Sequence, residues 1–85
     1  NMSFFVYLLI TKQKNKVISY VGYTSDIKKR LKLHNLSKGA KFTKGRKWKL
    51  VYSKKYNTKS IAMKEEIKLK KNYKLRKSIK ENLYK

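Results

Sequence analysis

Arg30 and His34 are the side chains whose types and spacing most directly suggest chemistry. They lie four residues apart, so they share one face of the helix predicted for this segment, together with Ile27 and Leu31. We therefore expect both at the edge of a buried stripe. Arg30 is one of three arginines among 25 basic residues, and a guanidinium offers phosphate oxygens a fixed fork of donors that lysine cannot copy. His34 is the single histidine and could exchange protons near neutral pH, with a structural role as the ordinary alternative.

Tyr7 and Tyr20 belong to two segments that are typical of a β-hairpin. If the turn is centred between Gln13 and Lys14, the two tyrosines form a direct cross-strand pair on one face of the sheet. A slip of one residue in the register would move either side chain to the opposite face. The strands alone favour an aromatic pair in the core over a functional pair.

Glu66 is the acidic side chain in the least expected place. Ala62, Glu66, Leu69 and Tyr73 lie on one stripe of a predicted helix, and the other three suit a core. An inward carboxylate is unfavourable unless it pairs with a cation or binds a metal. One carboxylate would suit Mg²⁺ if phosphate oxygens and waters completed the shell; an ion pair with a nearby lysine is the equal alternative. We expect the neighbouring Glu65 to be solvated.

A basic loop over residues 38–47 combines cations, glycines and a hydroxyl group. Glycine lets a backbone approach a ligand closely, and Lys, Arg and Thr donors fit phosphate oxygens. We therefore predict nucleic-acid contacts in this loop, with an ordinary solvated loop as the alternative. The predicted contacts are Lys38, Gly39, Lys41, Thr43, Lys44, Arg46 and Lys47.

The segments that carry these residues predict a small α+β fold. Residues 4–10 form a continuous apolar run typical of a strand covered on both faces. Residues 17–23 predict the return strand of a hairpin, and the alternation of Trp48, Leu50 and Tyr52 with polar or smaller neighbours predicts a third strand.

Two helices and a helical tail complete the prediction. Ser25 or Asp26 can cap a helix over residues 27–36, and Asn57 or Thr58 can cap a second helix to residue 71, with Asn72 as a break. The tail, residues 73–85, carries Leu75, Ile79 and Leu83 at intervals of four. The order β-β-α-β-α-α predicts a three-stranded antiparallel sheet flanked by helices. We expect a single domain over residues 1–85 with its core at 4–71.

The charge of the chain points to a polyanionic partner. There are 25 basic and four acidic residues, for a net charge of +21, which favours nucleic acid over an anionic membrane surface. The absence of cysteine excludes disulfides and thiolate metal sites. No apolar run has the length of a membrane span, and residues 4–10 lack the basic leader and cleavage site of a signal peptide. We expect an intracellular protein, in the cytoplasm or the nucleus or nucleoid, that is not secreted and has no membrane partner.

Together these segments resemble the GIY-YIG nuclease family, in particular its small stand-alone branch and the catalytic domain of junction-cutting endonucleases. The first motif corresponds to Phe5-Val6-Tyr7, and the second to Tyr20-Val21-Gly22 followed by Tyr23-Thr24. Arg30 and His34 follow Tyr20 by ten and fourteen residues, as the family pattern requires. Similar segments are Asp26–Leu31, His34-Asn35, Gly39–Thr43, Trp48–Tyr52 and the helix with Ala62, Glu66, Leu69 and Lys70. The resemblance covers residues 5–71, and it departs from the family where Phe5 and Val6 replace Gly-Ile.

The resemblance implies hydrolysis of a DNA phosphodiester, usually with a 5′-phosphate and a 3′-hydroxyl as products. By position, Glu66 would hold one Mg²⁺ or Mn²⁺ ion per active site, and Arg30 would neutralise charge on the phosphate. Tyr20 would activate or position the attacking water, and Tyr7 would support it. A phenol with a pKa of about 10 is a poor base at neutral pH, so this role needs a lowered pKa or a proton relay. We predict that His34 is the relay partner.

The hypothesis from sequence is therefore a divalent-metal-dependent DNA endonuclease that is structure-selective and has little sequence specificity. Its substrates would be branched, flap or nicked DNA in repair or recombination, and it could act with a protein partner or as a homodimer. The main alternative is a non-catalytic nucleic-acid-binding protein on the same scaffold. A cationic membrane-surface protein is a second alternative, for which the apolar stripe of the tail offers some support.

Overall fold

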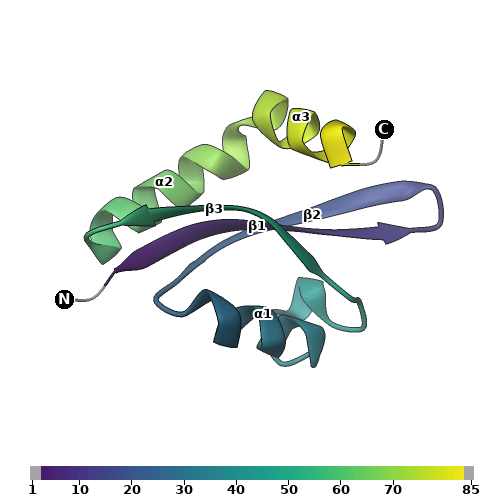
Figure 1. The fold of residues 1–85 in the computed structure, drawn as a ribbon, viewed down its shortest axis with the longest axis horizontal. Coiled ribbons are helices and arrows are strands. Elements are labelled where there is room, and N and C mark those ends of the chain that lie inside the picture. Colours follow the sequence, from purple (N-terminus) through teal and green to yellow (C-terminus); the bar gives the residue numbers. More distant parts are fainter. Residues whose placement is uncertain (1–2, 84–85) are drawn as a thin grey trace.

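The computed structural model describes residues 3–83 and has the predicted α+β architecture with the order β-β-α-β-α-α (Figure 1). The antiparallel sheet has the strand order β2-β1-β3, so the first strand is central. Helices α2 and α3 lie on one face of the sheet and α1 lies on the other. The elements are β1 (Phe4–Gln13), β2 (Lys16–Thr24), α1 (Ile27–Asn35), the 3₁₀ turn η1 (Lys41–Thr43), β3 (Lys49–Tyr56), α2 (Lys59–Lys71) and α3 (Tyr73–Leu83).

The central strand β1 separates two apolar clusters. Its residues from Val6 to Ile10 are all buried, which confirms that this apolar run is covered on both faces. On one face Val6 and Leu8 pack with residues of α2, including Ala62 and Leu69. On the other face Tyr7, Leu9 and Trp48 form the second cluster, against which residues of β2, β3 and α1 pack.

The hairpin register differs from the predicted one by two residues. Tyr7 pairs with Gly22, and Leu9 pairs with Tyr20, so the two tyrosines are diagonal neighbours rather than a direct pair. The cause is a tighter turn further along the chain, between Gln13 and Lys16, in which Lys14 adopts a positive φ of 58°. Because the offset is even, both tyrosines stay on one face of the sheet.

A β-bulge interrupts the pairing of β1 with β3. Leu8 pairs with Tyr52 whereas Leu9 pairs with Leu50, so Val51 has no partner of its own in the ladder. Simple alternation would put Leu50 and Tyr52 on one face. The bulge instead turns Leu50 toward the cluster on the α1 side, and Val51 and Tyr52 pack on the α2 side.

The helix boundaries follow from local capping chemistry. The Asp26 side chain accepts a hydrogen bond from Lys29 N at the start of α1, and the Thr58 side chain does the same at α2. Asn72 ends α2, as predicted.

The stripe predicted across the break at Asn72 is wrong for Tyr73. This residue begins α3 and is 62% exposed, because the break changes the direction of the helix and with it the phase of the stripe. Within the tail, Ile79 packs on the α2-side cluster and Leu75 is exposed. The side chain of Leu83, which was predicted on the same stripe, and residues 84–85 lie outside the described part of the chain.

Candidate active site

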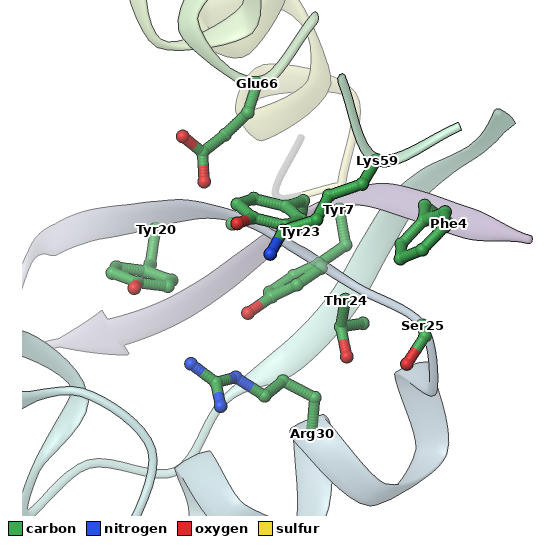
Figure 2. A pocket seen from close by; sticks show the side chains of 10 residues that line it. Phe4, Tyr7, Tyr20, Tyr23, Thr24, Ser25, Arg30, Lys59 and Glu66 are labelled. Carbon is green, nitrogen blue, oxygen red and sulfur yellow. The ribbon is translucent and has the colours of Figure 1, made fainter. Parts of the chain in front are cut away.

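A pocket of about 380 Å³ crosses the edge strand β2 and collects side chains from both faces of the sheet (Figure 2). In that view Glu66 of α2 lies on one side of the strand and Arg30 of α1 lies on the other, with tyrosine rings between them. The lining residues are Phe4, Tyr7, Tyr20, Gly22, Tyr23, Thr24, Ser25, Arg30, Lys59 and Glu66. Four of the five predicted catalytic side chains therefore meet in one pocket, and the fifth, His34, lies behind Tyr7.

Gly22 makes it possible for the Tyr7 phenol to reach the pocket. Tyr7 lies on the central strand and is 2% exposed, and Gly22 is its partner on the edge strand. A Cβ atom at position 22 would lie 2.6 Å from the Tyr7 Cζ atom, which is well inside van der Waals contact. The missing side chain lets the phenol extend across β2 to the open edge of the sheet.

His34 is completely buried and connects Tyr7 to the basic loop. Its Nε2 atom is 2.9 Å from the Tyr7 hydroxyl, and its Nδ1 atom is 2.8 Å from Thr43 Oγ1. The Thr43 hydroxyl donates its hydrogen to the Ala40 carbonyl oxygen at 3.0 Å, so it accepts from His34 Nδ1–H. Nε2 of the neutral ring is then the acceptor, and the Tyr7 hydroxyl donates to it.

This arrangement differs from the sequence prediction in the position of His34. The predicted position of His34 at the edge of a stripe is wrong, since the side chain has no exposed surface. The sequence left open which phenol His34 would contact, and in the structure Nε2 is hydrogen-bonded to Tyr7. Tyr20 instead packs against the imidazole, with 5.1 Å between ring centroids. The cause is the two-residue offset of the hairpin, which sets Tyr20 opposite Leu9.

Burial governs the protonation of the Tyr7–His34 pair. Loss of solvent raises the pKa of the Tyr7 phenol, while the hydrogen bond and charge of the neighbouring Arg30 act in the opposite direction. Loss of solvent also lowers the pKa of His34, and the positive charge of Arg30 adds to this effect. Both shifts favour a neutral phenol that donates to a neutral imidazole, in agreement with the hydrogen-bond pattern.

We expect the free energy of unfolding to fall as the pH drops below about 6.5, the ordinary pKa of histidine. The folded state lowers the pKa of His34, so the unfolded chain takes up the extra proton first and is favoured by acid, with a slope of at most about 1.4 kcal/mol per pH unit. Urea denaturation at pH 7.5, 6.5 and 5.5 and constant ionic strength measures this slope. His34→Gln is the control, because it should flatten the profile in the same window. A profile that is flat for the parent protein, or equally steep for both, would contradict the assignment.

Arg30 contributes an unpaired donor to the pocket. Its guanidinium points from α1 toward the tyrosine hydroxyls (Figure 2). The buried Nε atom has no hydrogen-bond acceptor among residues 3–83. Buried polar atoms are nearly always satisfied, so a donor left open beside a pocket is suited to an anionic oxygen from a ligand.

The structure shows one of the two alternatives that the sequence left open for Glu66, an ion pair with a lysine. Glu66 lines the pocket, and one carboxylate oxygen is 3.4 Å from Lys70 Nζ while its side chain keeps 17% of its surface exposed. Glu65 lies outside the pocket lining and was predicted to be solvated. It is instead held by Lys68 at 3.0 Å and accepts a long hydrogen bond from Tyr56 at 3.5 Å.

The basic loop is anchored as a unit beside the pocket. Asn35 bonds to the backbone N–H and carbonyl of Trp48, which closes the loop, and the Trp48 indole donates to the Thr43 carbonyl oxygen at 2.9 Å. Thr43 is fully buried and its hydroxyl is used by His34. A Cβ atom at Gly39 would lie 2.8 Å from His34 Cε1, so Gly39 makes room for the imidazole.

The remaining predicted loop contacts are on the outside of the molecule. Lys38, Lys41, Lys44 and Lys47 are exposed, and Arg46 is partly exposed. They do not line the pocket, so the predicted contacts of these residues with nucleic acid lie outside it.

Sequence reasoning missed several residues of the pocket. Lys59 lines it from the first turn of α2, and nothing in the sequence distinguishes this lysine from the others. Tyr23 lies on the opposite face of β2 from Tyr20, and both reach the pocket because β2 is an edge strand. The Tyr23-Thr24 pair after the second motif was the available signal for this part of the site.

The fold and the pocket define a small α+β domain whose candidate site combines a carboxylate, an arginine, the hydrogen-bonded phenol of Tyr7 and further tyrosine rings. Residues 3–81 match the family model of the GIY-YIG catalytic domain. The chain therefore belongs to the GIY-YIG family of nuclease domains, which confirms the resemblance found in the sequence. Among residues 3–83, no helix is long and apolar enough to span a membrane.

Relatives of this chain occur among the UPF0213 proteins of bacteria. The UPF0213 protein of Oceanobacillus iheyensis is 40% identical over 67 residues, covering 78% of this chain and 74% of that protein. The one from Staphylococcus saprophyticus is 45% identical over 65 residues, covering 75% and 78%. A UPF0213 protein of Streptococcus agalactiae is 52% identical over 48 residues, and here the alignment spans about half of the relative, 54%. No solved structure matches the chain at a significant level.

Proposed function

We propose that this protein is a divalent-metal-dependent DNA endonuclease that selects DNA by shape. The observation that carries the proposal is the convergence of Tyr7, Tyr20, Arg30 and Glu66 from four elements into one pocket. The surrounding chain has a net charge of +21, which would concentrate a polyanion at that pocket. Membership of a nuclease family supports the same class of reaction, the hydrolysis of nucleic-acid phosphodiester bonds.

Glu66 fits a single Mg²⁺ or Mn²⁺ ion. Within residues 3–83 no three His, Asp or Glu side chains gather as a ready metal cluster, so the protein would supply one carboxylate. Mg²⁺ is commonly bound in this way, by one or two carboxylates together with substrate phosphate and water. When bound, the ion supplies positive charge to the scissile phosphate and to the leaving oxygen.

The other side chains would hold the phosphate and take up a proton. Arg30 would bind non-bridging phosphate oxygens through its open donors and stabilise the charge that builds on them. The Tyr7 oxygen, whose hydrogen is directed to His34 Nε2, has lone pairs left for the attacking water. As the water attacks phosphorus, its proton passes to the Tyr7 oxygen and the Tyr7 proton passes to His34 Nε2. The bond from phosphorus to the 3′ oxygen breaks, and this leaving oxygen takes up a proton from solvent to become the 3′-hydroxyl. Tyr20 lines the same pocket and would orient the water or the phosphate.

We expect little sequence specificity. Reading sequence needs side chains placed against base edges in a groove, whereas the exposed loop residues here are mainly lysines, which suit phosphates. Flaps, nicks and branches bring two backbones onto one cationic surface, so these shapes should be preferred over linear duplex. A single pocket of this kind also favours one strand cut per event.

A panel of nicked, flap, branched and linear DNA tests the proposal, with Mg²⁺, with Mn²⁺ and with chelator. We expect cleavage only with metal, faster for the discontinuous substrates, and scattered over sequence when cuts are mapped in a random library. Metal-dependent cuts at one short sequence motif irrespective of branching would contradict shape selection. Tight DNA binding without cleavage of any substrate would contradict the nuclease function and favour the alternative, a non-catalytic nucleic-acid-binding protein.

A further inference from the structure

A second pocket of about 250 Å³ lies next to the candidate active site. It is lined by Ser19, Tyr20, Val21, Phe42, Lys70 and Arg76. Tyr20 lines both pockets. Lys70 lines the second pocket and forms an ion pair with Glu66 of the first. The two pockets are therefore adjacent, so two successive nucleotides of one DNA strand could occupy them.

Phe42 gives this second pocket an exposed aromatic wall. Its side chain is 50% exposed, although neighbouring groups hold it. Tyr20 is nearly parallel to it, at 19° and 6.1 Å between centroids, and Trp48 is also 6.1 Å away. The Arg46 guanidinium lies over the ring at 5.0 Å. An aromatic ring that is fixed in orientation and half open to solvent suits the stacking of a nucleic-acid base.

Arg76 gives the pocket a cationic wall. One terminal nitrogen donates to Ser19 Oγ at 3.3 Å and the other donates to the Lys70 carbonyl oxygen at 2.8 Å. The buried Nε atom has no acceptor within residues 3–83. A guanidinium has five N–H donors, so this anchored group has donors left for a phosphate oxygen.

We propose that this second pocket binds an unpaired DNA nucleotide next to the scissile phosphate, with its base on Phe42 and its phosphate on Arg76. The inference rests on the proposed nuclease function and narrows its substrate class. A base inside a duplex is covered by its stacked neighbours and must be pulled out before it can contact a protein ring, which costs a few kcal/mol. Flaps and frayed nicks provide such a base without this penalty, so the pocket selects them.

A double-mutant cycle between protein and DNA tests the stacking contact. Affinity is measured by fluorescence anisotropy, without divalent metal, for flap DNA carrying one abasic nucleotide that is moved stepwise across the junction. We expect Phe42→Ala to weaken binding of intact flap DNA by about 5- to 150-fold. At one position the abasic nucleotide should cause a similar loss, and there Phe42→Ala should have no further effect. Ile67→Ala is the matched control, since Ile67 is 51% exposed but lies on α2 outside this pocket.

Other variants separate the base contact from charge and from folding. Phe42→Trp should retain affinity, since it keeps a stacking surface. Arg76→Gln should reduce the salt dependence of binding by about one unit, equally for intact and abasic DNA. Additive losses at every abasic position, or an unchanged affinity for Phe42→Ala, would overturn the proposal. Because binding is measured without catalysis, a coupled position in a protein that never cleaves would refute the nuclease function and support the pocket as a nucleotide site.

Discussion

Glu66→Gln is expected to reduce the cleavage rate by about 1000-fold or more, because a metal ion contributes several kcal/mol to stabilising the transition state. The substitution keeps the volume of the side chain but removes the charge that would hold the cation. DNA affinity should survive, since the lysines that attract DNA are unchanged. The lost ion pair with Lys70 is partly exposed, so stability should change by less than about 1 kcal/mol. Single-turnover cleavage at saturating Mg²⁺ measures the rate, and filter binding measures the affinity.

Glu65→Gln is the matched control on the same helix. Glu65 is also a partly buried carboxylate paired with a lysine, but it does not line the pocket. We expect this variant to keep nearly the parent rate. A loss of the same size from Glu65→Gln would show that the wrong glutamate was chosen, and normal turnover by Glu66→Gln would reject the metal assignment.

Arg30→Ala is expected to lower the maximal rate by about 100- to 1000-fold, the effect typical of removing one donor that stabilises transition-state charge. Its Nε atom has no acceptor in the described part of the chain, so this donor is available to a phosphate oxygen in the parent protein and is lost in the variant. Arg30→Lys should recover only part of the rate, because lysine lacks the planar fork. Rates at saturating DNA separate this effect from weaker binding.

Single substitutions of Lys41 or Lys44 by alanine provide the comparison for Arg30. Both lysines are exposed, so each would make a screened contact that adds about one unit to the salt dependence of binding and favours all DNA alike. Their maximal rates should stay close to that of the parent protein. If Arg30→Ala changes only affinity and leaves the maximal rate intact, Arg30 acts as one more binding cation.

Local patterns in the sequence were sufficient to predict the elements of this fold. The burial of residues 6–10 on both faces followed from an apolar run without alternation. Asp26 and Thr58 were each one of two cap candidates, because their side chains can accept the first free N–H groups. These features depend on residues that are close together in the sequence, so they can be predicted from the sequence of this chain alone. The hairpin register depended on the position of a short polar turn, which several residues could form equally well, and the prediction was wrong by two residues.

The connections within the candidate site depend on tertiary packing, which the sequence pattern does not specify. The bond from Tyr7 to His34 joins residues 27 positions apart, and the bond from Arg76 to Ser19 joins residues 57 apart. Thr43 was expected at a phosphate, but it is buried beside the imidazole because η1 folds the loop back over α1. The β-bulge near Leu9 likewise has no signal in the alternation of β3.

The position of the pocket on β2 also affects how copies of the protein behave toward one another. β2 is an edge strand, and an unpaired edge invites another chain to add a strand and aggregate. Covering this edge with another segment would close the entrance to the pocket. Electrostatic repulsion between copies of the protein can prevent strand addition while the pocket stays open. The net charge of +21 provides it. Salt screens charges beyond about 10 Å at 0.1 M, so we expect rising ionic strength to weaken both the colloidal stability of the protein and the DNA binding proposed above.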